Sequence, residues 1–215
     1  MTDFATPSLV QLLKKAIRSA LVDCHTALPG KIIRYDKDLQ QADIQPMLKR
    51  KFLSTNKDVD APTITNVPVW TMQAEAGNAF IAMPLKAGDL GLIIFSERSI
   101  DTYLSSDGDK TIAPNDPRLH SFSDALFIPG LVPFSKAVKG IDDKAIHAGY
   151  GDIDLKLYDN GTIQILNTAN ELISVLSELI NNLITIPACA IPGFVNPALS
   201  AALGITKVKL DSFKK

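Results

Sequence analysis

The stretch from Gly88 to Asp101 restricts the fold more than any other part of the chain. A Gly-Asp turn precedes the apolar run from Leu90 to Phe95, which gives way abruptly to the charged residues Glu97 and Arg98. A short apolar run between a turn and charged residues is typical of a buried β-strand. The sequence therefore predicts a β-domain built around this strand.

Several neighbouring segments are also expected to be extended strands, and from Lys31 onward the pattern takes the period of two that marks strands. They are Lys31 to Asp36, Ala42 to Leu48, Pro62 to Met72, Ala79 to Leu85 and Ser123 to Ile128. Pro46 places the second of them at an edge or a bulge. Short strands separated by Gly, Pro and Asp favour a small Greek-key barrel such as an OB-fold, and a β-sandwich fits the same pattern almost as well. The long polar loop from Ser105 to Leu119 is expected to be functional or to pack against a partner.

An amphipathic helix is expected before the barrel. Thr6 and Pro7 are suited to its N-cap and first turn, and Pro29-Gly30 is expected to end it. Its apolar residues fall on one face opposite a basic face. We expect this face to pack on a neighbouring domain or subunit; binding to a membrane surface is the less frequent alternative.

Beyond Pro133 the pattern changes twice. Alternating residues around Asn160-Gly161 predict a hairpin too small to fold alone. From Ala169 a helix follows, with apolar residues at coiled-coil spacing over about two heptads. The segment 184–205 is apolar, but its prolines argue against a membrane-spanning helix. We expect a subunit interface formed by Leu172, Ile173, Leu176, Leu179, Ile180 and Leu183 of the helix and by Ile153, Leu155, Ile163 and Ile165 of the strands. The alternative for the helix is packing on its own barrel.

The expected organisation is mainly β with flanking helices. It comprises an N-terminal amphipathic helix (1–27), an OB-fold domain (28–136), a short trimeric β-prism or β-helix-like segment (137–168) and a helical, apolar segment for trimerisation or tip docking (169–215).

Bulk composition excludes several classes of function. Lys and Arg number 22 against 23 Asp and Glu, so the chain lacks the basic excess of a general nucleic-acid binder. Cys24 and Cys189 are far apart, and no basic and apolar leader precedes them, so we expect an intracellular, reduced protein. A hydrophobic content of 46% is high for a soluble monomer and favours a subunit interface.

Motifs for catalysis or metal binding are missing from the sequence. His25, His120 and His147 lie in separate segments, without the spacing of a metal site. The acid pairs Asp142-Asp143 and Asp152 with Asp154 are better explained as solvated positions. The densest polar cluster contains Asp116, Arg118, His120 and Asp124, and an ion-pair network that shapes the loop is its favoured interpretation. We therefore expect no enzyme activity, no cofactor and no metal.

A set of short motifs resembles a known family. They are Gly88-Asp89 with the apolar strand after it, Ser96 to Asp101, Asp116 to His120, Ser123 to Ala125 and Ile128 to Gly130. Together they resemble the N-terminal domain of the membrane-piercing spike proteins of contractile-tail phages. Ile146 to Ile153 and Asn160 to Ile163 look like the β-repeat that follows this domain in baseplate spike and hub proteins.

The resemblance implies an OB-fold, a homotrimer and a position on the axis of the tail baseplate, and the family carries no catalytic residues in this region. The chain departs from the pattern after Asn167, where a helix replaces further β-repeats and no His-x-His motif offers a metal site. We therefore expect a hub or spike base that holds a separate tip.

The resemblance leads to a functional hypothesis. The chain is expected to be a central hub or spike protein in the virion, made in the host cytoplasm, that plugs the tail tube and takes part in envelope penetration. Its expected partners are its own copies, baseplate hub and tail-tube proteins, a separate spike-tip protein and, transiently, the host envelope, but no nucleic acid. Two rival functions are a baseplate-associated cell-wall hydrolase and an OB-fold protein that binds single-stranded nucleic acid through Trp70, Phe80 and Phe95.

Overall fold

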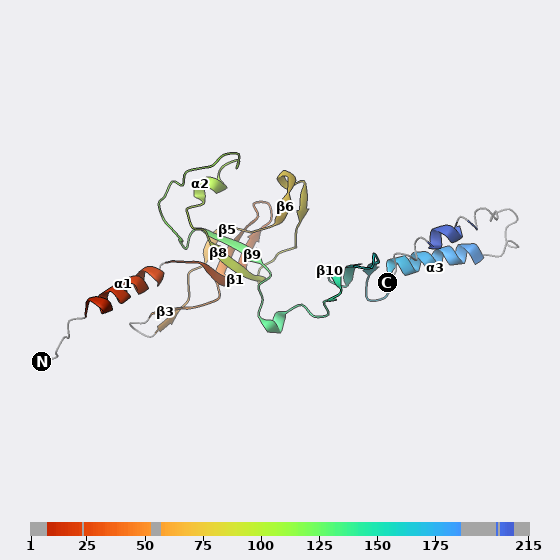
Figure 1. The fold of residues 1–215 in the computed structure, drawn as a ribbon, viewed down its shortest axis with the longest axis horizontal. Coiled ribbons are helices and arrows are strands. Elements are labelled where there is room, and N and C mark those ends of the chain that lie inside the picture. The colour runs from red at the N-terminus through yellow and green to blue at the C-terminus, as the bar shows by residue number, and fades with distance from the viewer. Residues whose placement is uncertain (1–7, 23, 53–56, 186–200, 202, 209–215) are drawn as a thin grey trace. The chain divides into compact units, whose positions relative to one another are not determined.

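The fold is mainly β, as the sequence predicts, and divides into two compact units (Figure 1). The computed structural model describes residues 8–22, 24–52, 57–185, 201 and 203–208. Unit 1 comprises Met1–Ala137, and unit 2 comprises Val138–Lys215.

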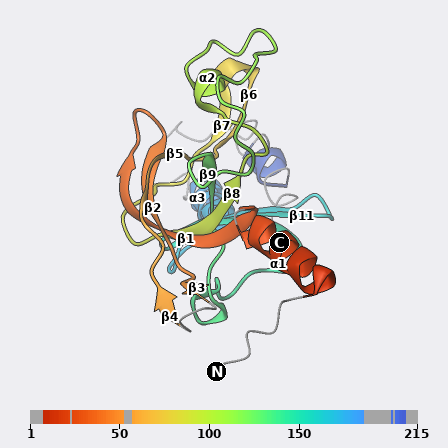
Figure 2. The same ribbon diagram turned by 90° about the vertical axis from the view of Figure 1, so that its left-hand side faces the viewer.

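A curled five-stranded sheet forms the centre of unit 1. Its strands are β1 (Ala27–Asp36), β2 (Gln41–Pro46), β5 (Ile64–Pro68), β8 (Leu90–Phe95) and β9 (Ala125–Pro129). The sheet order is β5-β2-β1-β8-β9, and every pair is antiparallel. An isolated parallel bridge between Val69 and Phe127 brings the two ends of the sheet together, so the sheet curls into a half-barrel (Figure 2).

The core of unit 1 lies inside this curl. Alternate residues of β2 and β8 are buried, and Ile44 and Ile93 are completely enclosed. Phe127 of β9 fills the centre with them. The strand from Leu90 to Phe95 is a central strand paired on both sides, as its apolar run predicts.

Two glycines that face each other across β1 and β8 allow this close packing. Gly30 pairs with Gly91 in the ladder. A Cβ atom on Gly30 would lie 2.7 Å from side-chain atoms of both Ile44 and Ile93, and one on Gly91 would overlap the Phe127 ring. Pro29-Gly30 is thus part of a strand, and the expectation that it ends the N-terminal helix is wrong. The helix α1 (Leu9–Val22) ends earlier, and the expected start at Thr6-Pro7 lies outside the described residues.

Two hairpins extend from the barrel. The first pairs β3 (Arg50–Phe52) with β4 (Lys57–Val59), and the second pairs β6 (Met72–Ala74) with β7 (Ala79–Ile81) around the 3₁₀ turn η1 (Glu75–Gly77). The prediction that Ala79 to Leu85 adds a strand to the barrel is therefore wrong, because this segment pairs only with β6.

The prediction of a long polar loop is confirmed. The short helix α2 (Asp101–Leu104) follows the central strand, and residues 105–118 contain neither helix nor strand. A bridge between Arg98 and Leu119 closes the base of this loop. The turn η2 (Phe134–Lys136) stands near the end of unit 1.

Unit 2 consists of a three-stranded antiparallel sheet and helices. The sheet order is β10 (Ala145–Tyr150), β11 (Ile153–Tyr158), β12 (Ile163–Leu166). The predicted Asn160-Gly161 hairpin joins β11 to β12. The helix α3 (Leu172–Thr185) follows and contacts β12, and residues 203–208 are also helical. Most of the apolar segment 184–205 lies outside the described residues, and within the described part no helix is long and apolar enough to cross a membrane.

Candidate assembly surfaces

One face of the unit 2 sheet is apolar and open. The register places Ile146, Leu157 and Ile163 in one cross-strand row and Ala148, Leu155 and Ile165 in the next. Ile146 is 74% exposed and Ile153 59% exposed, although both are aliphatic. An aliphatic face of this size would normally be covered in a soluble protein.

The opposite face of the same sheet is polar and closely hydrogen-bonded. His147 Nε2 lies 2.9 Å from Asp154 Oδ1, and the backbone N–H of Asp142 donates to His147 Nδ1 over 3.2 Å. Tyr158 donates its hydroxyl proton to Asp142 Oδ2, and Lys156 Nζ lies 3.7 Å from the same oxygen. Because Nδ1 accepts a hydrogen bond, the proton of a neutral His147 is on Nε2 and points to Asp154.

This arrangement reverses the expected burial. Asp152 and Asp154 are both expected on the solvated side of the strand; Asp152 is exposed, but Asp154 is half-buried, whereas Ile153, Leu155 and Leu157 are exposed. The polar side chains satisfy one another within the unit, so the polar face needs no further partner. Among the described residues of the chain, the apolar face has no such cover.

The helix α3 shows the same division. We call the apolar residues at coiled-coil spacing on this helix the leucine seam. Three of them are exposed, namely Leu172, Leu176 and Leu179, whereas Ile180 is half-buried and Ile173 is buried within its own chain. The side chain of Leu183 lies outside the described part of the helix. Of the expected strand residues, Ile153, Leu155 and Ile165 are exposed and Ile163 is half-buried.

Glu171 fixes the beginning of α3. Its two carboxylate oxygens accept hydrogen bonds from the backbone N–H groups of Ile173 and Ser174 over 3.0 and 2.6 Å. Burial of this carboxyl opposes its ionisation, but these hydrogen bonds outweigh burial and lower the pKa of Glu171 below its ordinary value. The seam therefore begins from a capped first turn.

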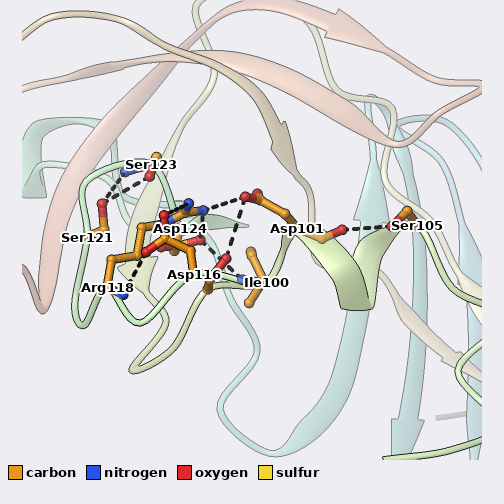
Figure 3. Close-up of polar contacts among 9 residues, drawn as sticks. Ile100, Asp101, Ser105, Asp116, Arg118, Ser121, Ser123 and Asp124 are labelled. Carbon is orange, nitrogen blue, oxygen red and sulfur yellow. Dashed lines mark hydrogen bonds and ion pairs between the residues drawn. The ribbon is translucent and has the colours of Figure 1, made fainter. Parts of the chain in front are cut away.

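The densest polar cluster of the sequence is an ion-pair network around one arginine (Figure 3). Arg118 donates from Nε and from one terminal nitrogen to the two oxygens of Asp124, over 2.7 and 2.8 Å. The same terminal nitrogen lies 2.6 Å from Asp101 Oδ2, and the other lies 3.2 Å from Asp116 Oδ2. This geometry agrees with a network that shapes the loop.

Asp124 is the buried member of the network. Its side chain is 0% exposed, and besides the bidentate contact with Arg118 it accepts the backbone N–H of Ile100 over 3.1 Å. The hydrogen bonds from Arg118 lower the pKa of Asp124 below its ordinary value, and they outweigh burial, which acts in the opposite direction. The aspartates in turn raise the pKa of Arg118. The three carboxylates are held as ion-pair partners of a single cation.

The three histidines form no common side-chain site among the described residues, although the backbone N–H of His25 donates to the carbonyl of His120 over 3.1 Å. His120, expected in the Arg118 cluster, contributes no side-chain contact to it, and its Nδ1 is buried without a described hydrogen-bond partner. The His25 ring packs tilted against Phe95 and edge-on against Phe122, and its Nε2 lies 3.0 Å from an Arg50 nitrogen. Among the described residues no group of His, Cys, Asp and Glu is arranged to hold a metal ion.

Sequence reasoning missed two contacts in these surfaces. Asp101 joins the Arg118 network from 17 residues away, and no local pattern marks that pairing. The His147 to Asp154 contact could have been found, because β11 carries Asp154, Lys156 and Tyr158 at alternate positions, which places them on one face.

A comparison with known families finds a match over the barrel region. Residues 28–130 match the family model for the phage protein Gp138 N-terminal domain. The match supports the interpretation of the chain as a phage structural protein. It spans the curled sheet from β1 to β9, with both hairpins and the Arg118 network, and covers just under half of the chain. It points to a virion-associated component. No curated protein matches the chain.

Proposed function

We propose that the chain is a homotrimeric central hub or spike protein of a contractile-tail baseplate, which plugs the tail tube and takes part in penetration of the host envelope. The observation that carries this proposal is the open apolar face of the unit 2 sheet beside a capped helix with an exposed leucine seam. The phage-domain match and the resemblance to spike proteins support the location.

The barrel of unit 1 supports the OB-type fold in this proposal. An OB-fold is a five-stranded, partly open Greek-key barrel. The five-strand order β5-β2-β1-β8-β9 and the parallel bridge from Val69 to Phe127, where the first and last strands of the order meet, support such a barrel.

Three copies of unit 2 would bury what one copy exposes. Around a threefold axis the three sheets form the sides of a prism, and the rows containing Leu155 and Leu157 face the interior as stacked apolar layers. The exposed seam of α3 would meet its symmetry mates below or above this prism. The result is a stiff plug whose strength comes from apolar burial between chains.

Leu176 tests the seam. We expect Leu176→Asp to prevent trimer formation, because it places three carboxylates at one level of the axis. Glu178→Lys, also on the exposed surface of α3 but away from the leucines, is the control and should leave the trimer intact. Light scattering coupled to size exclusion measures both; a trimer that persists in Leu176→Asp would remove α3 from the interface.

The location is tested on tailed particles that contain the chain. We expect gold-labelled antibodies against unit 1 to mark the baseplate end of the tail once the baseplate is opened by mild denaturant. Labelling of the head or of the tube along its length would contradict a hub or spike role.

We further propose that the chain acts without catalysis and without nucleic acid. Arg118 engages Asp101, Asp116 and Asp124, so these acids are not poised as an acid and base pair. Phe95, one of the expected base-stacking residues, is buried in the core. We expect no peptidoglycan release by the wild-type chain and no salt-dependent DNA binding; an activity lost in both Asp116→Asn and Asp124→Asn would restore the hydrolase.

A further inference from the structure

A short segment of unit 2 is attached to the polar face of the three-stranded sheet. We call residues 138–144, which precede β10, the entry segment, because the chain passes through them on its way from unit 1 into that sheet. The entry segment contains neither helix nor strand. Its attachment to the sheet therefore depends on individual hydrogen bonds.

Asp142 makes the contacts that hold the entry segment. Its backbone N–H donates to His147 Nδ1 over 3.2 Å, and its Oδ2 accepts the hydroxyl proton of Tyr158 over 2.7 Å. Lys156 Nζ lies 3.7 Å from the same oxygen. The side chains of Asp142 and Lys156 are each 17% exposed and that of His147 is 13% exposed, so water competes little for these contacts.

Gly149 makes room for the second contact of the histidine. The register pairs Gly149 with Asp154, in the row next to His147 on the same face of the sheet. A Cβ atom on Gly149 would lie 2.6 Å from Asp154 Oδ1, the oxygen that lies 2.9 Å from His147 Nε2. The φ of Gly149 is outside the left-handed region, so the space above the residue is what favours a glycine here.

The two nitrogens of His147 therefore have different tasks. The proton on Nε2 points to Asp154, and the lone pair on Nδ1 accepts the N–H of Asp142. A second proton would go to Nδ1, where it would face the Asp142 N–H. Because two donors cannot share one hydrogen bond, a protonated His147 keeps Asp154 as a charge-assisted partner and loses the backbone of Asp142.

The titratable groups that face His147 come from β11 and from the entry segment. They are Asp154, Lys156 and Tyr158 of β11 and the side chain of Asp142, whereas β12 carries no titratable residue. Two carboxylates and one ammonium group give this cluster one negative charge, which balances an imidazolium. The exposed charged residues of the entry segment are Lys139, Asp143 and Lys144.

We propose that His147 is a pH-dependent latch for the entry segment. Neutral His147 holds the backbone of Asp142 against the sheet, and protonated His147 releases it. The latch goes beyond the proposed function and does not depend on it, because it lies within one chain and on the face opposite the apolar rows. The way in which the chain enters the unit 2 sheet therefore responds to acid.

Hydrogen exchange of the Asp142 amide tests the latch in the full-length chain. It is measured between pH 8 and pH 5, the range in which histidine side chains commonly change charge, and is expressed as a protection factor to remove the intrinsic pH dependence of exchange. We expect the protection factor to fall by about fivefold, the equivalent of one ordinary hydrogen bond. NMR shifts of the His147 ring on the same samples should change over the same pH interval.

His147→Gln removes the titrating group and keeps a polar side chain. The protection factor of the Asp142 amide should then be independent of pH, although His25 and His120 are still present.

Two glycines give a matched pair of further variants. Gly149→Ala displaces Asp154 from the histidine, so the ring loses the contact that orients it, and we expect low protection of the Asp142 amide already at pH 8. Gly204→Ala, where a Cβ atom would meet no described atom within 4 Å, should keep both the wild-type protection and its fall in acid.

Two results would overturn the proposal. The first is a protection factor at Asp142 that stays constant between pH 8 and pH 5. The second is a fall in protection that persists in His147→Gln, which would assign the change to another group. Light scattering on the same samples follows the trimer separately, so neither result decides the proposed function.

Discussion

The two units bury their side chains in opposite ways. In unit 1 the apolar residues turn inward and form a closed cluster around Phe127, Ile44 and Ile93. In unit 2 the polar side chains of one sheet face are satisfied among themselves, and the aliphatic face is left open. Unit 1 therefore has the core of an independent domain, whereas unit 2 exposes an aliphatic face, which the proposed trimer would bury.

The two units are therefore expected to differ in how their stability depends on protein concentration. A domain with its own core unfolds with a free energy that does not depend on protein concentration, whereas an assembly dissociates on dilution. Trp70, in unit 1, reports on the barrel alone. The changes below are ordered from the largest expected effect to the smallest.

Leu155→Asp in the open face of unit 2 should have the largest effect. Three carboxylates would lie among apolar rows, so we expect the chain to be monomeric at micromolar concentration. Unfolding of unit 1, followed by Trp70, should change by less than about 0.5 kcal/mol. The control is Val59→Asp in β4, where the side chain is 45% exposed, close to the 39% of Leu155. If the control chain is also monomeric, any aspartate introduced at an exposed position would disrupt assembly.

Phe127→Ala should damage unit 1 most. The ring is completely buried at the centre of the half-barrel, and such truncations cost about 3–5 kcal/mol. We expect this loss in urea unfolding followed by Trp70. If the core of unit 1 is independent, the loss is the same at low and high protein concentration; a concentration-dependent loss would make unit 1 a part of the assembly.

Asp124→Asn should cost unit 1 about 2–3 kcal/mol, because it removes a buried charge from the bidentate contact with Arg118. Exposed neighbours such as Asp101 still neutralise Arg118, which keeps the loss at the lower end of the range for buried ion pairs. Asp116→Asn, at a half-exposed carboxyl, should cost less than about 1 kcal/mol. Equal losses in the two variants would mean that burial of Asp124 is unimportant.

Acid should weaken unit 1 by a smaller amount. The pKa of Asp124 in the folded barrel lies below its ordinary value of 3.8, so the unfolded chain binds this proton first as pH falls. The stabilisation is therefore complete above about pH 5, and it declines as pH falls through 3.8 towards the folded pKa. Asp43, whose pKa is lowered by Arg34 and by the Asn66 N–H, acts in the same direction.

The acid effect is measured as the free energy of unfolding between about pH 5 and pH 2.5. We expect the wild-type chain to lose about 1–2 kcal/mol more over this range than Asp124→Asn does. Parallel pH profiles for the two chains would contradict the assigned role of Asp124.

Much of the barrel was predictable because its strands alternate. The central strand from Leu90 to Phe95 follows from its apolar run, the buried positions of β2 follow from the period of two, and Asn160-Gly161 marks its hairpin. Pro29-Gly30 was misread as a helix end because both residues usually break structure. Here Gly30 is required by the close approach of Ile44 and Ile93, which no local pattern reveals.

The sequence pattern does not show which segments pair with one another. Ala79 to Ile81 is apolar like the central strand of the barrel, yet it pairs with β6 in a hairpin whose turn holds Glu75, Ala76 and Gly77 at positive φ. The cluster around Arg118 was recognised from nearby residues, whereas its contact with Asp101 was not. The exposed rows of unit 2 were expected as interface positions, but their exposure in the single chain could come only from the structure.

The mass of the intact chain in solution tests the difference between the units most directly. Light scattering across a dilution series, with Trp70 emission recorded on the same samples, separates assembly from folding. We expect three times 23.3 kDa, about 70 kDa, at micromolar concentration, and a barrel that keeps its emission when dilution reduces that mass. A 23.3 kDa monomer that retains its fold at micromolar concentration would contradict the trimer and, with it, the role assigned to the open face of unit 2.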